Sequence, residues 1–211
     1  MPKTRTRPAR RPPDARKGRE ATVSRKTKET EISLVLHIDG SGHADLDTGI
    51  PFLNHMLDSF ARHGFFDLFV RARGDLDVDQ HHTVEDIGLT LGKAWRQALG
   101  DKAGIRRFGD ASCPLDEALV SAVVDLSGRP FLTYNLKIEQ ARVGDFDTEL
   151  VHDFMAALAN EVGMNLHLNQ IQGRNPHHVI EAAFKALARA LDKASQIDPR
   201  VKGVLSTKGS L

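Results

Sequence analysis

The sequence predicts an α+β fold, an α/β sandwich, that arose by internal duplication of one smaller unit. Two observations support this prediction. The pattern His-His-x-x-Glu occurs twice, at residues 81–85 and 177–181. A helix-like segment, a glycine and a strand-like segment precede each copy in the same order and at nearly the same separation. Because self-similarity at a fixed spacing is typical of repeated structural units, we expect two matching halves.

The first half shows alternation between strand and helix patterns. Residues 31–39 alternate apolar and polar side chains and predict a strand, followed by a turn-rich link with room for a short strand. A helix is expected from Pro51 to Gly64, and residues 65–75 predict another strand. The helix expected from about His81 has one apolar stripe, made by Val84, Ile87, Leu91, Trp95 and Ala98.

The second half predicts the same kinds of element. Residues 118–126 and 131–138 predict two strands joined by the tight turn "SGRP". A helix over 148–163, a strand over 164–171 and a helix over 177–194 follow. Asn175 is a suitable N-cap for the last helix, and Pro176 suits its first position.

Composition sets the expected domain limits and cellular setting. Eleven of the first 28 residues are Lys or Arg, so residues 1–26 are predicted to be a disordered, solubilising basic tail. One domain is expected over 27–211, with halves at about 27–110 and 111–200 and a C-terminal phosphate-binding segment. The net charge of +1 and the lack of a long apolar run predict neither nucleic-acid binding nor a membrane location. The single cysteine, Cys113, favours a reducing compartment, the cytoplasm.

The two His-His-x-x-Glu motifs predict metal sites. On a helix, His81 and His82 both neighbour Glu85, but the two adjacent histidines diverge by about 100°. A single ion rarely binds both, whereas two ions can take one each. The same geometry applies to His177 and His178 with Glu181. Imidazole with carboxylate suits several divalent ions, and the mixed nitrogen and oxygen donors favour Mn²⁺ or Fe²⁺.

Further ligands are needed to complete such sites. His55 lies in the first helix of the first half, and its counterpart in the second half falls at Asp153 or the adjoining His152. His167, in a predicted strand, is another possibility. The internal repeat favours His55 over a merely packed histidine, whereas the choice among the other three stays open.

Several cationic and hydroxyl side chains predict an anion site. Arg106 and Arg107 are adjacent, Arg129 lies in the "SGRP" turn, and Lys185 follows Glu181 by one helical turn. The C-terminal sequence "LSTKGSL" offers hydroxyls, a lysine and a glycine, which suit a phosphate. Together with a metal site, these residues predict a small phosphorylated substrate.

The longest motifs resemble a known family. The stretches "DTGIPFLNHMLDSFARHGFFDL", "HHTVEDIGLTLGKAWRQALGDKAGIRRFGD", "DEALVSAVVDLSGRP", "GRNPHHVIEAAFKALARAL" and "GVLSTKG" are similar to those of imidazoleglycerol-phosphate dehydratases, over about residues 27–211. The resemblance implies a duplicated half-domain with a four-stranded sheet and two helices, similar to the second domain of ribosomal protein S5. It also implies a homo-oligomer of trimers assembled into a 24-mer, with active sites between subunits.

The resemblance also implies the site residues. Two Mn²⁺ ions per active site are expected, with the metal ligands His55, His81, His82, Glu85, Asp153, His177, His178 and Glu181. The position of Asp153 is often histidine in relatives. The substrate-binding set, with the arginines and the C-terminal residues for the phosphate, comprises Glu29, Arg107, Arg129, Lys185, Ser206, Thr207 and Lys208.

The implied reaction is the dehydration of imidazole glycerol phosphate to imidazole acetol phosphate, in histidine biosynthesis. The metals would stabilise the imidazolate form of the substrate, and a carboxylate would be the general base. Glu181 is the first candidate for the base, with Glu29 and Glu85 as rivals. Two alternatives remain: another di-metal enzyme that acts on a phosphorylated metabolite, such as a phosphohydrolase, and a metal-binding shell protein without activity.

Overall fold

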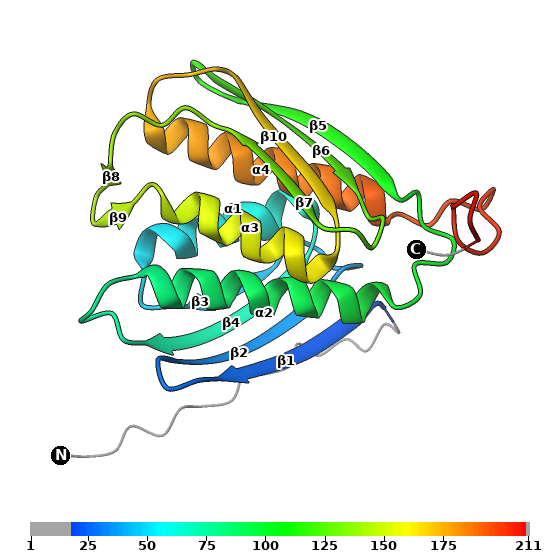
Figure 1. The fold of residues 1–211 in the computed structure, drawn as a ribbon, viewed down its shortest axis with the longest axis horizontal. Coiled ribbons are helices and arrows are strands. Elements are labelled where there is room, and N and C mark those ends of the chain that lie inside the picture. The colour runs from blue at the N-terminus through cyan, green and yellow to red at the C-terminus, as the bar shows by residue number, and fades with distance from the viewer. Residues whose placement is uncertain (1–17, 210–211) are drawn as a thin grey trace.

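The computed structural model describes residues 18–209 and places the strands and helices of each half in the same order (Figure 1). The first half contains β1 (Glu20–Lys26), β2 (Thr30–His37), β3 (Ala44–Asp47), α1 (Pro51–Gly64), β4 (Asp67–Gly74) and α2 (His81–Leu99). The second contains β5 (Phe108–Leu115), β6 (Ala118–Asp125), β7 (Phe131–Asn135), α3 (Leu150–Val162), β10 (Asn165–Gln172) and α4 (Pro176–Ser195). A short ribbon of β8 (Arg142–Val143) and β9 (Phe146–Asp147) is inserted before α3.

The topology of the two sheets confirms the predicted duplication. The strand orders are β1-β2-β4-β3 and β5-β6-β10-β7. In each sheet the first three strands pair antiparallel and the last pair is parallel. The predicted turn "SGRP" does connect β6 and β7, but β10 lies between these two strands in the sheet.

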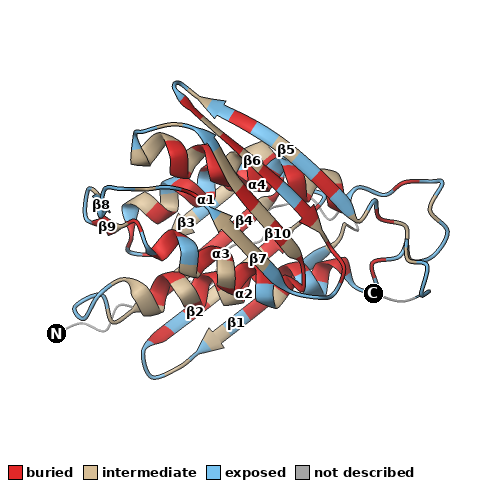
Figure 2. Cartoon of the chain, turned by 45° about the horizontal axis from the view of Figure 1, so that its top comes forward, coloured by how far each residue is buried: buried red, intermediate tan, exposed pale blue. Residues whose placement is uncertain are grey.

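The sheets enclose the helices in a sandwich. Figure 1 shows one sheet on each outer side with the four helices between them. The strands alternate buried and more exposed residues, as in β2, because one face of each sheet packs on the helices (Figure 2). Large side chains such as Trp95, Phe60 and Phe154 are fully buried in this central layer. The predicted α+β sandwich is therefore confirmed.

Each helix pair in the central layer joins the two halves of the chain. Helix α1 packs on α4, and α2 packs on α3. The α2–α3 approach is close because α2 presents Gly88 and Gly92 to α3. A Cβ at Gly88 would lie 2.9 Å from the carbonyl oxygen of Phe154, and one at Gly92 would lie 2.6 Å from Cβ of Glu161.

The ends of α1 and α3 fix the correspondence between the halves. Phe65 follows α1 with φ 59°, and Gly163 follows α3 with φ 70°, so both helices end in a left-handed residue. A strand begins two residues later in both cases. His55 and Asp153 each lie ten residues before these left-handed residues, so Asp153 is the structural counterpart of His55.

The predicted start of the folded domain at residue 27 is too late. Strand β1 occupies Glu20–Lys26, where the sequence predicted a disordered tail, and all seven of its residues pair with β2, from Lys26 with Glu31 to Glu20 with His37. Ala21 and Val23 are buried in the core. Only two apolar side chains mark this alternation in the sequence, because the next inward-facing position is Arg25, whose Nε lies 2.9 Å from Oδ1 of the buried Asp86. Residues 1–17 lie outside the described part of the chain, so the prediction of disorder is untested there.

Candidate metal and substrate site

One group of predicted metal ligands forms a compact cluster between α1 and α4. Nε2 of His55 and Nε2 of His177 each lie 3.2 Å from Oε2 of Glu181. The ligand atoms of these three residues all lie within 4.8 Å of one another. Because metal–ligand bonds to imidazole and carboxylate are about 2.0–2.2 Å long, one ion can contact three atoms at such separations. Asn175 caps α4 by accepting hydrogen bonds from the backbone N–H groups of His177 and His178.

A second, looser cluster lies between α2 and α3. Nδ1 of His81 is 3.4 Å from Oδ2 of Asp153, and Nε2 of His81 is 3.9 Å from Oε2 of Glu85. Asp153 takes the place that His55 has in the first cluster. This second group contains one imidazole and two carboxylates, but Asp153 and Glu85 face opposite nitrogens of the His81 ring, so its ligand atoms do not converge as those of the first cluster do.

The second histidine of each motif does not join the cluster of its own helix. Nδ1 of His82 lies 3.0 Å from Oδ2 of Asp75, and Nδ1 of His178 lies 2.7 Å from Oε2 of Glu117. These hydrogen bonds raise the pKa of both histidines. The hydrogen bond with His178 lowers the pKa of Glu117 to about 2. The predicted divergence of adjacent histidines is therefore present in both motifs.

Glu181 is strongly engaged within its own helix and cluster. Its Oε1 lies 2.7 Å from Nζ of Lys185, while Oε2 contacts the two histidines. Burial acts to raise the pKa of Glu181, but the hydrogen bond and charge of Lys185 outweigh it, and the pKa is lowered. Lys185 thus lies with the metal cluster. Glu29 lies on the exposed turn between β1 and β2, where its charge helps to raise the pKa of His82.

The predicted phosphate-binding residues gather mainly at the C-terminal segment. A cavity of about 1010 Å³ is lined by residues that include Arg106, Arg107, Arg200, Lys202, Ser206 and Thr207. The guanidinium of Arg107 donates from Nε and Nη2 to the carboxylate of Asp125, and from Nη1 to the carbonyl oxygen of Leu205. Arg107 therefore holds the C-terminal segment in place. Lys208 is exposed on that segment and Arg129 in the turn after β6.

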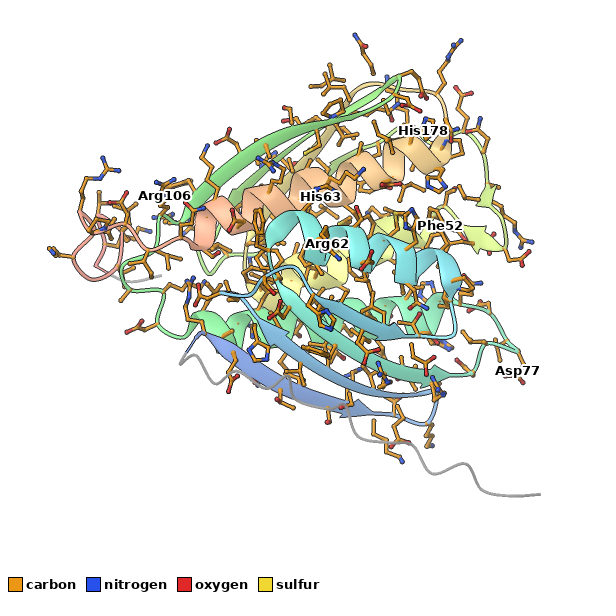
Figure 3. The ribbon with its side chains drawn as sticks, turned by 180° about the vertical axis from the view of Figure 1, so that it is seen from behind. Phe52, Arg62, His63, Asp77, Arg106 and His178 are labelled. Carbon is orange, nitrogen blue, oxygen red and sulfur yellow. The ribbon has the colours of Figure 1, made fainter. Side chains whose placement is uncertain are left out.

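These cationic residues and the histidine clusters occupy opposite ends of the molecule. Glu117, which contacts His178, precedes β6, and Asp125, which binds Arg107, ends it. Eight residues of strand span roughly 25 Å. Figure 3 shows His178 and Arg106 near opposite ends of α4. One small substrate cannot reach both groups within a single chain.

The structure separates the three candidates for the open ligand position. Oδ2 of Asp153 contacts His81, whereas His152 packs its ring edge-on against Tyr134, with ring centroids 5.2 Å apart, and reaches the cluster only through Oδ1 of Asp153, 3.2 Å from its Nδ1. His167 lies on β10 beside Phe131, with ring centroids 6.2 Å apart. Asp153 is therefore the residue that joins a cluster.

Two of the residues that contact the motif histidines, Asp75 and Glu117, were not predicted from the sequence. Asp75 lies seven residues before His82, in the loop between β4 and α2, and Glu117 lies 61 residues before His178, so neither belongs to the His-His-x-x-Glu pattern itself. A signal does exist for Glu117, since Glu29 and Glu117 each immediately precede the second strand of their half, β2 and β6. Comparison of the repeats could have found it.

The fold and the site define a duplicated α+β protein with one compact group of potential metal ligands, a second, looser group, and a separate gathering of cationic residues at the other end. The family model for imidazoleglycerol-phosphate dehydratase matches residues 48–191. The chain belongs to this family, whose members are enzymes of the lyase class. Family membership disfavours the alternatives of a phosphohydrolase and an inactive metal-binding shell.

Individual relatives cover almost the whole chain. The imidazoleglycerol-phosphate dehydratases of Geobacter metallireducens and Geobacillus sp. are 58% and 60% identical to it, over 92% of this chain and 99% of each relative. The crystal structure of the Staphylococcus aureus enzyme has a TM-score of 0.78 at 37% identity, covering 85% of this chain and 99% of that one. The Pyrococcus furiosus enzyme, in complex with (S)-C348, has a TM-score of 0.78 at 39% identity, covering 90% and 100%. Over residues 18–209, no helix is long and apolar enough to cross a membrane.

Proposed function

We propose that this chain dehydrates imidazole glycerol phosphate to imidazole acetol phosphate in histidine biosynthesis, with two Mn²⁺ ions per active site. Family membership supports the reaction. The observation that supports the metals is the compact cluster of His55, His177 and Glu181, together with the looser contacts of His81 with Glu85 and Asp153 at the equivalent place in the repeat. Their mixed imidazole and carboxylate donors suit Mn²⁺. Bound Mn²⁺ would supply Lewis-acid stabilisation of negative charge on the imidazole ring of the substrate.

Among the three candidate bases, the contacts favour Glu29. The carboxylate of Glu181 is shared among two histidines and Lys185, and its pKa is lowered, so it is a weak base. Glu85 belongs to the second cluster through His81. Glu29 stands on an exposed turn near His82. Its carboxylate is therefore the one best placed to take a proton from a bound substrate.

The cationic end would bind the phosphate and so orient the imidazole ring. Arg129, Ser206, Thr207 and Lys208 offer charges and hydroxyls there, with Arg107 holding the segment. Because this end and the clusters lie at opposite ends of α4, the active site would combine the clusters of one chain with the phosphate-binding residues of another. A homo-oligomer of trimers assembled into a 24-mer is part of this proposal, as is a cytoplasmic location, which the single, buried Cys113 supports.

Co-expression of two differently tagged inactive variants tests the shared site. His177→Ala removes a cluster ligand, and the double variant Arg129→Ala and Lys208→Ala removes phosphate-binding cations. Each variant alone should give little turnover of imidazole glycerol phosphate. In mixed oligomers, some sites combine the intact clusters of one variant with the intact cations of the other. With equal amounts of the two chains, about a quarter of the sites or fewer have both parts intact, so activity should return to about a quarter of wild type or less.

The control is co-expression of His177→Ala with a second, differently tagged His177→Ala chain, which should stay inactive at every ratio. Mixed oligomers that contain both tags and remain as inactive as the parent variants would contradict a site shared between chains.

A further inference from the structure

The two His-His-x-x-Glu motifs share a feature outside the metal clusters. In each motif the second histidine is held by a carboxylate from a separate loop: Asp75, after β4, holds His82, and Glu117, in the β5–β6 turn, holds His178. Both contacts are made at Nδ1. Asp75 lies between β4 and α2 of the first half, whereas Glu117 lies between β5 and β6 of the second. The two carboxylates therefore do not occupy equivalent positions in the repeat, and duplication of a single residue does not account for both.

These contacts determine which ring nitrogen carries the proton. A carboxylate accepts hydrogen bonds, so Nδ1 of the facing imidazole must be the N–H donor. In the neutral ring the lone pair then lies on Nε2, the atom that is free to bind a cation. Nε2 of His178 faces the carboxylate of Asp116 only at 3.8 Å, beyond hydrogen-bonding distance. The ring is thus prepared as a ligand in its neutral form.

The carboxylate of Glu117 also fixes the start of helix α4. Its Oε1 accepts hydrogen bonds from the backbone N–H groups of Arg174, at 3.2 Å, and Asn175, at 2.8 Å. The remaining oxygen, Oε2, contacts His178. One side chain therefore anchors the loop that caps α4 and, with its other oxygen, sets the orientation of the His178 ring.

We propose that Glu117 is a positioning residue for His178, and Asp75 its counterpart for His82, each holding Nδ1–H so that Nε2 is directed outward as a ligand for a divalent cation. The inference rests on the proposed function, because it assumes that His178 and His82 bind metal. It adds two residues that touch neither substrate nor metal but govern metal affinity through the histidines they hold.

Glu117→Gln separates the two roles of this carboxylate. The single amide oxygen of glutamine should keep accepting the hydrogen bonds from the backbone N–H groups of Arg174 and Asn175. The opposite orientation would place the NH₂ group, a donor, against these two donors. With the oxygen on the backbone side, the NH₂ group faces Nδ1 of His178, and the imidazole must accept there and carry its proton on Nε2. That tautomer cannot bind a cation through Nε2. The capping loop, however, keeps its hydrogen bonds.

The measurement is Mn²⁺ affinity, followed by the electron paramagnetic resonance signal of free Mn²⁺ during titration of metal-free protein. Glu117→Gln should weaken the affected site by about 10–100-fold, the range known for lost hydrogen bonds to metal-bound histidines. The thermal unfolding midpoint of the metal-free variant should stay at the wild-type value. Glu117→Ala, which also loses the backbone contacts, should lower both. Glu139→Gln, at an exposed loop position, is the matched control and should change neither.

Three results would count against these assignments. Wild-type affinity in Glu117→Gln would overturn the positioning role while leaving the proposed function intact. If Glu117→Gln lowers the thermal unfolding midpoint together with the Mn²⁺ affinity, as Glu117→Ala is expected to do, then Glu117 has a structural role only. This result would also overturn the positioning role. Wild-type protein that binds no Mn²⁺ would overturn the proposed metal dependence and this inference together.

Discussion

Asp153 and His55 occupy equivalent positions in the two halves but offer different ligand atoms. Because of this difference, one cluster has two imidazoles and the other has two carboxylates. Carboxylate oxygen favours harder ions such as Mn²⁺, and imidazole nitrogen favours Zn²⁺ and Co²⁺ more strongly. The two proposed metal sites should therefore differ in selectivity, although they occupy equivalent places in the repeat.

Asp153→His should make the two clusters alike. The added imidazole should raise the affinity of the second cluster for Zn²⁺ relative to Mn²⁺ by about tenfold, following the preference of nitrogen donors for later transition metals. Competition titrations of Zn²⁺ against Mn²⁺ would measure the ratio. The same change at exposed Asp110, on β5, is the control. An unchanged Zn²⁺ to Mn²⁺ ratio in Asp153→His would show that residue 153 does not bind the ion.

At this residue scale, the sequence indicates the candidate metal ligands better than it indicates the carboxylates that form hydrogen bonds with His82 and His178. The two motifs and His55 were predicted because the spacing of helical positions is fixed by geometry. The hydrogen bond to Glu117 depends on a turn 61 residues away from His178, which no local pattern indicates, and the one to Asp75 depends on the conformation of the loop between β4 and α2. The choice of Asp153 over His152 also required the direction of each side chain on α3.

At the scale of elements, the glycines of α2 bring the second cluster together. Gly88 and Gly92 let α3 approach closely, and this approach places Asp153 beside His81. Gly88 and Gly92 are visible in the sequence of α2. A glycine on a helix surface can face solvent or a closely packed helix, however, so the sequence does not decide between the two. The pairing of α2 with a helix from the other half is a tertiary contact that propensity does not predict.

Gly92→Ala should push α2 and α3 apart. The new Cβ would lie 2.6 Å from Cβ of Glu161 and 2.9 Å from the carbonyl oxygen of Leu158, so overpacking should cost about 1–3 kcal/mol in the free energy of unfolding. Urea unfolding at fixed protein concentration would measure this cost. Lys93→Ala, at the adjacent exposed position, is the control. If the alanine variant were as stable as wild type, the helix contact would not be as tight as described.

Strand β1 is tied to the fold by an ion pair that should titrate. Arg19 binds Asp39 through Nε and Nη2 and also donates to the carbonyl oxygen of Ser195. The hydrogen bond from Arg19 lowers the pKa of Asp39 despite the opposing effect of burial. A lowered pKa in the folded state stabilises the protein above the unfolded value of 3.8, and this contribution is lost as the pH falls through the folded value.

Asp39→Asn should therefore destabilise the protein at pH 6 but not at strongly acidic pH. The pair is partly exposed, so the expected difference at pH 6 is at most about 1 kcal/mol. It should shrink below about pH 4 as the wild-type carboxylate takes up its proton. Urea unfolding at pH 6 and pH 3 would measure the difference, with Asp58→Asn, at an exposed position on α1, as the control. A difference that stays constant or grows towards acid would contradict this assignment.

At the scale of the whole molecule, the duplication could be predicted from the sequence, but the separation of the histidine clusters from the candidate phosphate-binding residues could not. The repeated motifs indicated two halves, and the matching strand orders confirm them. Each cluster nevertheless joins helices of both halves, α1 with α4 and α2 with α3. The distance between the clusters and the phosphate-binding end also follows only from the direction of β6 and α4 in the fold (Figure 3).

The central claim is that the two clusters bind the metals that dehydration requires. The direct measurement is turnover of imidazole glycerol phosphate by chelator-treated protein as Mn²⁺ is added back. We expect no ketone product without metal, and activity that saturates at about two Mn²⁺ per chain, one for each cluster. Full turnover by metal-free protein, or saturation at a single ion per chain, would contradict the account.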